Sequence, residues 1–257
     1  MESKKQKIGR YSYVAEPFHV DFSGKLSWSV LGNNLLNSAE FHSTDRGFGI
    51  ARLNKDNYTW VLSRLAIEVS ELPKQFESYT IETWVENVYR LFTDRNYALY
   101  NSDKRCIGYA RSIWAMINFK TRKPANLIEL HGDDINSYKV DQACPIEKPT
   151  RIKVKSQEAV SKVQTKYTDI DINGHVNSVR YIDYILNLFT LEKYANYRVK
   201  RFEIAYVTES YFNDVLCLFI DENSEKEYAV EVRKESGEIV CRSKIEFEIL
   251  EKDSHIK

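Results

Sequence analysis

The feature that most constrains the fold is a pattern of elements that the chain uses twice. Each half opens with an apolar segment of helical period, residues 30–41 in the first half and 176–189 in the second. Four strand-like segments follow each helix: residues 60–69, 78–87, 89–101 and 106–119, and then 197–207, 215–221, 228–234 and 239–249. A helix followed by consecutive strands predicts an α+β unit in which an antiparallel sheet wraps one helix.

Short stretches of the two halves also correspond. The sequence SRLAI at 63–67 is equivalent in position to KRFEI at 200–204, and Arg111-Ser112 is equivalent to Arg242-Ser243. Arg64 and Arg111 in the first half are 47 residues apart, and Arg201 and Arg242 in the second half are 41 residues apart. Either one structural unit is repeated or two β-rich halves are alike by chance, and the repeated order of elements favours the repeat.

Residues 120–155 separate the halves, contain three prolines and have little periodicity. We expect a boundary near residue 145, with subdomains over 1–145 and 146–257. Basic residues gather beside this boundary, and they are Lys148, Arg151, Lys153, Lys155, Lys162 and Lys166. They either protect a solvated edge strand or form a docking surface for an acidic partner.

Bulk composition narrows the class of protein. With 43% hydrophobic residues and a formal net charge of zero, the chain is typical of a globular protein and lacks the basic excess of a nucleic-acid binder. Its four cysteines form no C-x-x-C pair, so zinc and thiol-redox motifs are not indicated. No apolar run approaches the ~20 residues of a membrane span, and the charged N-terminus does not look like a signal peptide. We therefore expect a cytoplasmic protein.

Chemistry-bearing side chains concentrate just before the second predicted helix. Asp171, Asn173 and His175 place an acid, an amide and an imidazole at i, i+2 and i+4. Such a set can hold a polarised water or a nucleophile beside a helix N-terminus. Two structural alternatives exist, since Asp171 and Asn173 can form an Asx turn and His175 can be a buried, hydrogen-bonded histidine.

Three separate motifs, in the right order, carry a resemblance to a known family. The sequence DIDINGHVNSVRYI at 169–182 is similar to the signature DxDxNxHVNNxxYI, and WVLSR at 60–64, TWV at 83–85 and RSIWAMIN at 111–118 are similar to further family motifs. The chain thus resembles the acyl-[acyl-carrier-protein] thioesterase family. The resemblance implies a tandem (double) hot-dog fold, each half a long helix wrapped by an antiparallel sheet. It also implies hydrolysis of the thioester that joins a fatty acyl chain to the phosphopantetheine arm of acyl carrier protein.

The chain departs from the family pattern in two ways. The Glu-Cys pair of the family corresponds here to Glu209-Ser210, so a mechanism with a cysteine nucleophile at that position is in doubt. Ser210 lacks the Gly-x-Ser-x-Gly surroundings of a serine nucleophile. The chain also lacks the targeting extension of plant members, which favours a bacterial-type cytoplasmic enzyme.

The resemblance adds Glu209 to the candidate catalytic set of Asp171, Asn173 and His175. Asp171 and Glu209 are the expected acid/base or nucleophilic carboxylates, while Asn173 and His175 orient and polarise. No cofactor and no metal are expected. The first half has no acid or histidine in the corresponding sequence SGKLSW at 23–28, so it is free to form the acyl pocket. Candidate pocket residues are Leu35, Leu36, Ala39, Trp60, Ile81 and Trp84.

Other functions stay open at this point. A thioesterase acting on acyl-CoA is the main alternative, and the spread of lysines over residues 148–166 favours the carrier protein over the compact basic pocket that CoA needs. A hydratase or dehydratase of the same fold, or a non-catalytic acyl-binding protein, are further alternatives. The protein is expected to be a monomer or a homodimer.

Overall fold

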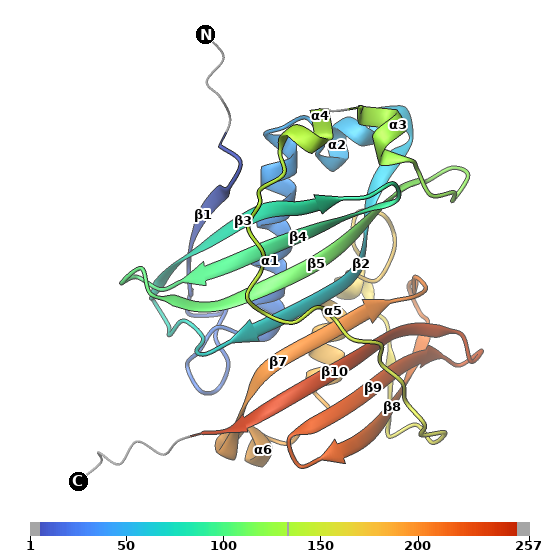
Figure 1. Cartoon of the computed structure of the whole chain (residues 1–257). Coiled ribbons are helices and arrows are strands. Elements are labelled where there is room, and N and C mark those ends of the chain that lie inside the picture. The colour runs from blue at the N-terminus through green and yellow to red at the C-terminus, as the bar shows by residue number, and fades with distance from the viewer. Residues whose placement is uncertain (1–5, 133, 251–257) are drawn as a thin grey trace. The chain divides into compact units, whose positions relative to one another are not determined.

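The computed structural model describes residues 6–132 and 134–250. The chain divides into two compact units, Met1–Pro149 and Thr150–Lys257. Each unit contains its own antiparallel sheet and its own helices, so each is described separately (Figure 1).

The sheet of the first unit has the strand order β1-β3-β4-β5-β2, and neighbouring strands are antiparallel. The strands are β1 (Gly9–Val14), β2 (Tyr58–Val69), β3 (Ser78–Val88), β4 (Phe92–Tyr100) and β5 (Cys106–Asn118). The long helix α1 (Trp28–Thr44) lies against one face of this sheet (Figure 1). Short helical segments complete the unit: α2 (Ile50–Leu53), η1 (Asn54–Asp56), α3 (Leu127–His131) and α4 (Asp134–Ser137).

Helical periodicity explains which face of α1 is buried. Leu31, Leu35 and Ala39 follow one another at four-residue steps, and all three are buried. Side chains at this spacing share one helix face, and burial of a leucine contributes about 1.5–3 kcal/mol. The predicted helix and its apolar face are therefore confirmed, and the helix extends beyond the predicted residues 30–41 at both ends.

A neutral histidine is buried between α1 and the sheet of the first unit. His42 is fully buried, and its Nδ1 lies 3.0 Å from Nη1 of the buried Arg95. Its Nε2 lies 3.1 Å from the carbonyl oxygen of Lys7. Because a guanidinium only donates, Nδ1 must accept, and the ring proton must sit on Nε2, where it donates to Lys7. Burial, together with the charges of Arg95 and Arg46, lowers the pKa of His42 to about 2.

This histidine predicts acid sensitivity of the first unit. In the unfolded chain His42 regains an ordinary pKa of about 6.5, so below that pH it binds a proton that it does not bind in the folded chain. Its contribution to stability is therefore present above about pH 6.5 and is lost on acidification. We expect the free energy of unfolding to fall by up to about 1.4 kcal/mol per pH unit between about pH 6 and pH 4. Urea unfolding across this range measures the slope. His42→Asn keeps an acceptor for Arg95 but does not titrate, so its slope should be shallower, and equal slopes would contradict the assignment.

The sheet of the second unit has the order β7-β10-β9-β8-β6, again antiparallel throughout. Its strands are β6 (Ser161–Gln164), β7 (Tyr197–Tyr206), β8 (Val215–Ser224), β9 (Glu227–Lys234) and β10 (Ile239–Ile249). The helical segments are η2 (Tyr167–Asp169), α5 (Arg180–Leu186) and α6 (Leu191–Asn196). Ile182 and Ile185 of α5 are fully buried, and the ring of Tyr181 on the same helix packs against that of Tyr206 on β7.

The helix predicted over residues 176–189 is shorter in the structure, and this corrects the expectation of a long helix in the second half. Backbone N–H groups at its expected start are used elsewhere: Val176 donates to the carbonyl of Ser210 at 2.8 Å, and Asn177 to that of Asp169 at 2.8 Å. The Asn177 side chain then accepts from the N–H of Val179 at 3.2 Å. The helix begins only at Arg180.

The basic residues beside the boundary do not form one element. Lys162 lies on the short strand β6 and pairs with Glu235 at 2.9 Å. Residues 151–155 lie outside the strands, with Arg151, Lys153 and Lys155 exposed. The edge-strand interpretation therefore applies to Lys162, while the docking interpretation stays a prediction for the others.

Candidate active site

The loop before α5 is a tight turn built on Asp171. The N–H of Asp171 donates to the carbonyl of His175 at 2.8 Å, and the N–H of Gly174 donates to the carbonyl of Asp171 at 3.0 Å. Gly174 has a φ of +80°, which favours glycine. The Asp171 carboxylate accepts from the N–H of Asn173 at 2.8 Å and of His175 at 3.2 Å. The Asx turn is thus present, and it fixes the backbone that carries His175.

A second loop, residues 207–214, lies beside this turn. The hydrogen bond from Val176 to the carbonyl of Ser210 joins the two loops directly. Thr165 adds a second connection, because its hydroxyl donates to the carbonyl of Tyr211 at 2.6 Å. Residues far apart in the sequence are therefore held together by backbone contacts.

The two loops bring His175 and Glu209 together. Nε2 of His175 lies 3.5 Å from Oε2 of Glu209, and both side chains are partly buried. A carboxylate held beside an imidazole in this way can accept a proton from a water bound next to the pair. Partial exposure leaves the pair open to a substrate.

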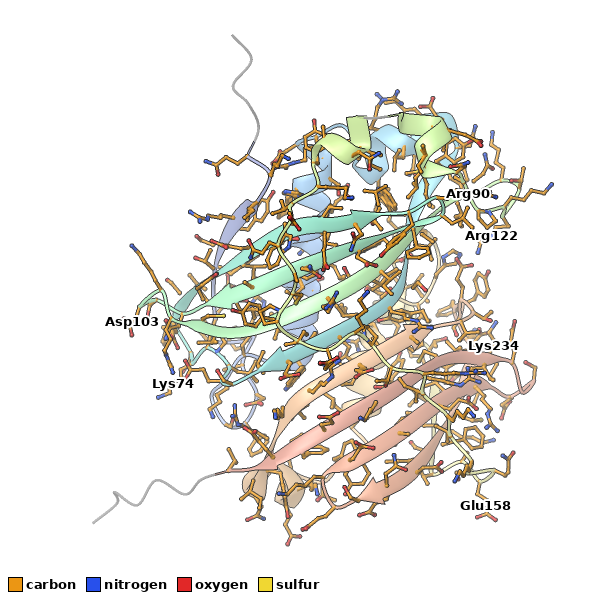
Figure 2. All side chains as sticks on the ribbon, in the orientation of Figure 1. Lys74, Arg90, Asp103, Arg122, Glu158 and Lys234 are labelled. Carbon is orange, nitrogen blue, oxygen red and sulfur yellow. The ribbon has the colours of Figure 1, made fainter. Side chains whose placement is uncertain are left out.

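Tyr211 contacts both His175 and Glu209, and it was not predicted from the sequence. Its ring meets the His175 ring edge-on, with centroids 5.2 Å apart and planes at 82°. Its hydroxyl donates to Oε2 of Glu209 at 3.5 Å. Lys234, labelled in Figure 2, lies with its ammonium 5.5 Å from the centre of the Tyr211 ring. The only signal in the sequence was the position of Tyr211 two residues after Glu209.

The remaining predicted residues take different places. Asp171 contacts the backbone of His175, as described above. The Asn173 side chain is exposed at the turn, and among the described residues it makes no hydrogen bond. Ser210 is 0% exposed, so its hydroxyl is shielded from substrate, in agreement with its rejection as a nucleophile.

Asp169 anchors the start of α5. Its carboxylate accepts from Nε of Arg180 at 3.0 Å and from the N–H of Lys166 at 2.7 Å. Burial alone would raise the pKa of Asp169, but the hydrogen bonds from Lys166 and Arg180 outweigh burial and lower it. Asp169 is therefore a charged anchor between the site loop and the helix.

Neither a metal cluster nor a membrane-crossing helix is found in the part of the chain that the structure describes. Within residues 6–132 and 134–250, no three His, Cys, Asp or Glu side chains gather so that they could hold a metal ion. Among the helices of the same residues, none has the length and apolar character that crossing a bilayer requires.

Two family models match the chain in order. The acyl-ACP thioesterase N-terminal domain matches residues 8–131, and the acyl-ACP thioesterase C-terminal domain matches residues 152–249. A chloroplastic acyl-[acyl-carrier-protein] hydrolase of Cuphea viscosissima is 24% identical over an alignment of 257 positions. The alignment covers 93% of this chain and 61% of that protein. Two further hydrolases of the same plant are covered over 43% and 46% of their length. The chain therefore spans about half the length of these curated relatives.

Solved structures give closer matches over whole chains. An acyl-ACP thioesterase from Bacteroides thetaiotaomicron is 63% identical, with 94% of this chain and 98% of that chain covered and a TM-score of 0.90. The 12:0-ACP thioesterase from Umbellularia californica is 17% identical, with 96% and 100% covered and a TM-score of 0.84, and it shows the fold alone. The predicted α+β fold class with two hot-dog halves in tandem is confirmed. Since both domain models match in order and a relative of 63% identity matches over nearly its whole length, the chain belongs to the acyl-[acyl-carrier-protein] thioesterase family.

Proposed function

We propose that the protein hydrolyses the thioester of fatty acyl-acyl-carrier-protein, which releases a free fatty acid and ends chain elongation. The observation that carries the proposal is the partly buried pair of His175 and Glu209 at 3.5 Å, on two loops joined by backbone hydrogen bonds. Membership of the thioesterase family supports this reaction class. The partner is then acyl carrier protein, and neither a cofactor nor a metal takes part.

The chemistry requires an activated water more than an acid. In the proposed reaction, Glu209 takes a proton from water, and the water oxygen bonds to the thioester carbonyl carbon. The carbon–sulfur bond then breaks, and the thiolate, with a thiol pKa of about 8.5, leaves without strong acid assistance. His175 orients the carboxylate and polarises the reacting groups. Asp171 shapes the turn and acts with Glu209 as the second acid/base carboxylate, while the exposed amide of Asn173 is available to orient water or the thioester.

Tyr211 predicts a graded effect on turnover. Tyr211→Phe removes the 3.5 Å contact to Glu209 but keeps the ring edge against His175. Because the lost hydrogen bond is long, we expect kcat to fall only about 3- to 10-fold with KM nearly unchanged. Tyr211→Ala removes both contacts and should lower kcat further. The matched control is Tyr197→Phe, since Tyr197 also contacts a glutamate, Glu225, but lies outside the site loops. A Tyr211→Phe enzyme with wild-type kcat across the pH profile would show that Tyr211 plays no part.

The reaction is tested by thiol release from matched acyl-carrier and acyl-CoA thioesters with chains of roughly 8 to 18 carbons. Fast release from the carrier substrates, with free fatty acid as the second product, supports the proposal. Release from CoA substrates alone would replace it with an acyl-CoA thioesterase. Binding without release would favour an acyl-binding protein.

We further propose that the first unit supplies the acyl pocket and the second unit the catalytic residues. Leu35, Ile81 and Trp84 are fully buried and give the first unit an apolar interior. Each methylene of a bound chain is worth about 0.8 kcal/mol, so pocket depth would set the preferred chain length. The cytoplasmic location and the choice between monomer and homodimer stay predictions.

A further inference from the structure

The turn that precedes α1 in the first unit repeats the hydrogen bonds of residues 171–175. The N–H of Asp21 donates to the carbonyl of Lys25 at 2.8 Å, and the N–H of Gly24 donates to the carbonyl of Asp21 at 2.9 Å. The Asp21 carboxylate accepts from the N–H of Ser23 at 2.8 Å and from that of Lys25 at 3.4 Å. Gly24 has a φ of +70°, close to the +80° of the glycine in residues 171–175. The first unit therefore contains a counterpart of the turn at the candidate active site.

A second loop is joined to this turn in the same way as residues 207–214 are joined to the turn of the second unit. The N–H of Leu26 donates to the carbonyl of Pro73 at 2.8 Å. Its counterpart is the 2.8 Å hydrogen bond from the N–H of Val176 to the carbonyl of Ser210. Position 73 is therefore equivalent to position 210, and position 72 is equivalent to position 209.

The backbone of this second loop is also the same in both units. Phe76 has a φ of +66°, and its counterpart Asn213 has a φ of +68°. Bulky side chains rarely adopt this conformation, whereas asparagine does so more often. The N–H of Phe76 donates to the carbonyl of Ala15 at 2.7 Å, as that of Asn213 donates to the carbonyl of Thr165 at 3.3 Å. The loop conformation is thus kept in the first unit by its hydrogen bonds, even at a residue that does not favour it.

The two units differ in the side chains that this common backbone carries. The counterparts of Asp171, Asn173, His175 and Glu209 are, in that order, Asp21, Ser23, Lys25 and Leu72. Asp21 lies just before the segment 23–28 that was compared from sequence, so the counterpart turn keeps an acid. A lysine ammonium only donates hydrogen bonds, and a leucine cannot take up a proton. The first unit therefore has the scaffold of the site without the imidazole–carboxylate pair.

The positions that would carry such a pair are as accessible as in the second unit. Lys25 and Leu72 are half-buried, as are His175 and Glu209. Histidine and glutamate are close in size to the lysine and leucine that they would replace, and substitutions that conserve volume are tolerated best. The two loops of the first unit can therefore accept the pair, and a small substrate can reach it.

We propose that the first unit contains a silent second catalytic site for thioester hydrolysis, in which the backbone and Asp21 are retained and positions 23, 25 and 72 are changed. This inference rests on the proposed function, because the reaction is the one proposed for the second unit. In the restored site, the carboxylate introduced by Leu72→Glu takes a proton from water, and the water oxygen bonds to the thioester carbonyl carbon. The carbon–sulfur bond then breaks, and the proton passes to the departing thiolate.

The test restores the missing side chains in a protein whose own site is disabled. The substitutions Ser23→Asn, Lys25→His and Leu72→Glu are added to His175→Ala, and this protein is called the restored variant. The probe is the acetyl thioester of N-acetylcysteamine, because its short acyl group needs no deep pocket. We expect kcat/KM for thiol release to be at least about tenfold higher in the restored variant than in His175→Ala alone.

The matched control carries Leu72→Gln in place of Leu72→Glu. Glutamine has the size of glutamate but cannot take a proton from water, so the control should release thiol no faster than His175→Ala alone. A restored variant that folds and still matches its glutamine control would overturn the proposal. The proposed function would stand in that case, because it depends on the wild type and the acyl-carrier substrate.

A crystal structure of the restored variant tests the scaffold without turnover. The introduced imidazole and carboxylate should approach each other about as closely as His175 and Glu209, which are 3.5 Å apart. A structure in which the two groups lie apart would overturn the proposal even if the wild type hydrolysed no thioester. Failure of the restored variant to fold beside a folded glutamine control would also count against it, since the loop would then not accept the carboxylate.

Discussion

Replacing Glu209 by glutamine is expected to lower kcat for acyl-carrier thioester hydrolysis by about 10²- to 10⁴-fold, with KM nearly unchanged. Glutamine keeps the size of the side chain and can still accept a hydrogen bond from Tyr211, but it cannot take a proton from water. The loss should therefore appear in the chemical step, which single-turnover kinetics with saturating enzyme measure directly.

The control for this variant is Glu225→Gln, because Glu225 also accepts from a tyrosine hydroxyl but lies on the surface away from the site loops. It should retain kcat within about twofold. If Glu209→Gln also turned over at near wild-type speed, Glu209 would not be the base, and the 3.5 Å approach to His175 would have only a structural meaning.

Replacing Asp171 by asparagine is expected to lower kcat by about 10²-fold while leaving the fold intact. The Asp171 carboxylate accepts from the N–H groups of Asn173 and His175, and an asparagine side-chain oxygen can accept both. The substitution therefore removes charge and keeps the turn. Steady-state kinetics and thermal unfolding, measured together, separate the two effects.

Asp171→Ala supplies the comparison, since it removes the charge and both hydrogen bonds. It should be destabilised by about 1–2 kcal/mol in addition to losing activity. If Asp171→Asn were fully active and only Asp171→Ala were impaired, Asp171 would act solely as the Asx-turn residue that the sequence also allowed.

The strands and the first helix could be predicted from sequence because their periodicity reflects burial. The predicted bounds of the four strands in each half agree with the structure to within a few residues. Strands β1 and β6 were missed, because they are short and lie at the ends of their sheets, where only one neighbour imposes a pattern. The second helix was predicted too long, because apolar periodicity continues through residues 176–179, where the chain is not yet helical. There the N–H groups of Val176 and Asn177 bond to Ser210 and Asp169, and that of Val179 bonds to the Asn177 side chain.

The candidate site was predictable only in part. Asp171, Asn173 and His175 stand out as a local pattern, but Glu209 lies 34 positions after His175 and only the family resemblance joined the two. Tyr211 carries no motif at all, since its role depends on two turns meeting in space. The opposite placements of Asn173, exposed, and Ser210, buried, likewise depend on how those turns are held together.

The initial rate of thiol release from a single acyl-carrier thioester, measured with wild-type protein and His175→Ala side by side, tests the catalytic role of the His175–Glu209 pair most directly. We expect the wild type to release thiol and free fatty acid in equal amounts. We expect the variant to lose at least about 10²-fold of this rate with an unchanged unfolding midpoint. Absence of release by the wild type, or equal release by the variant, would contradict it.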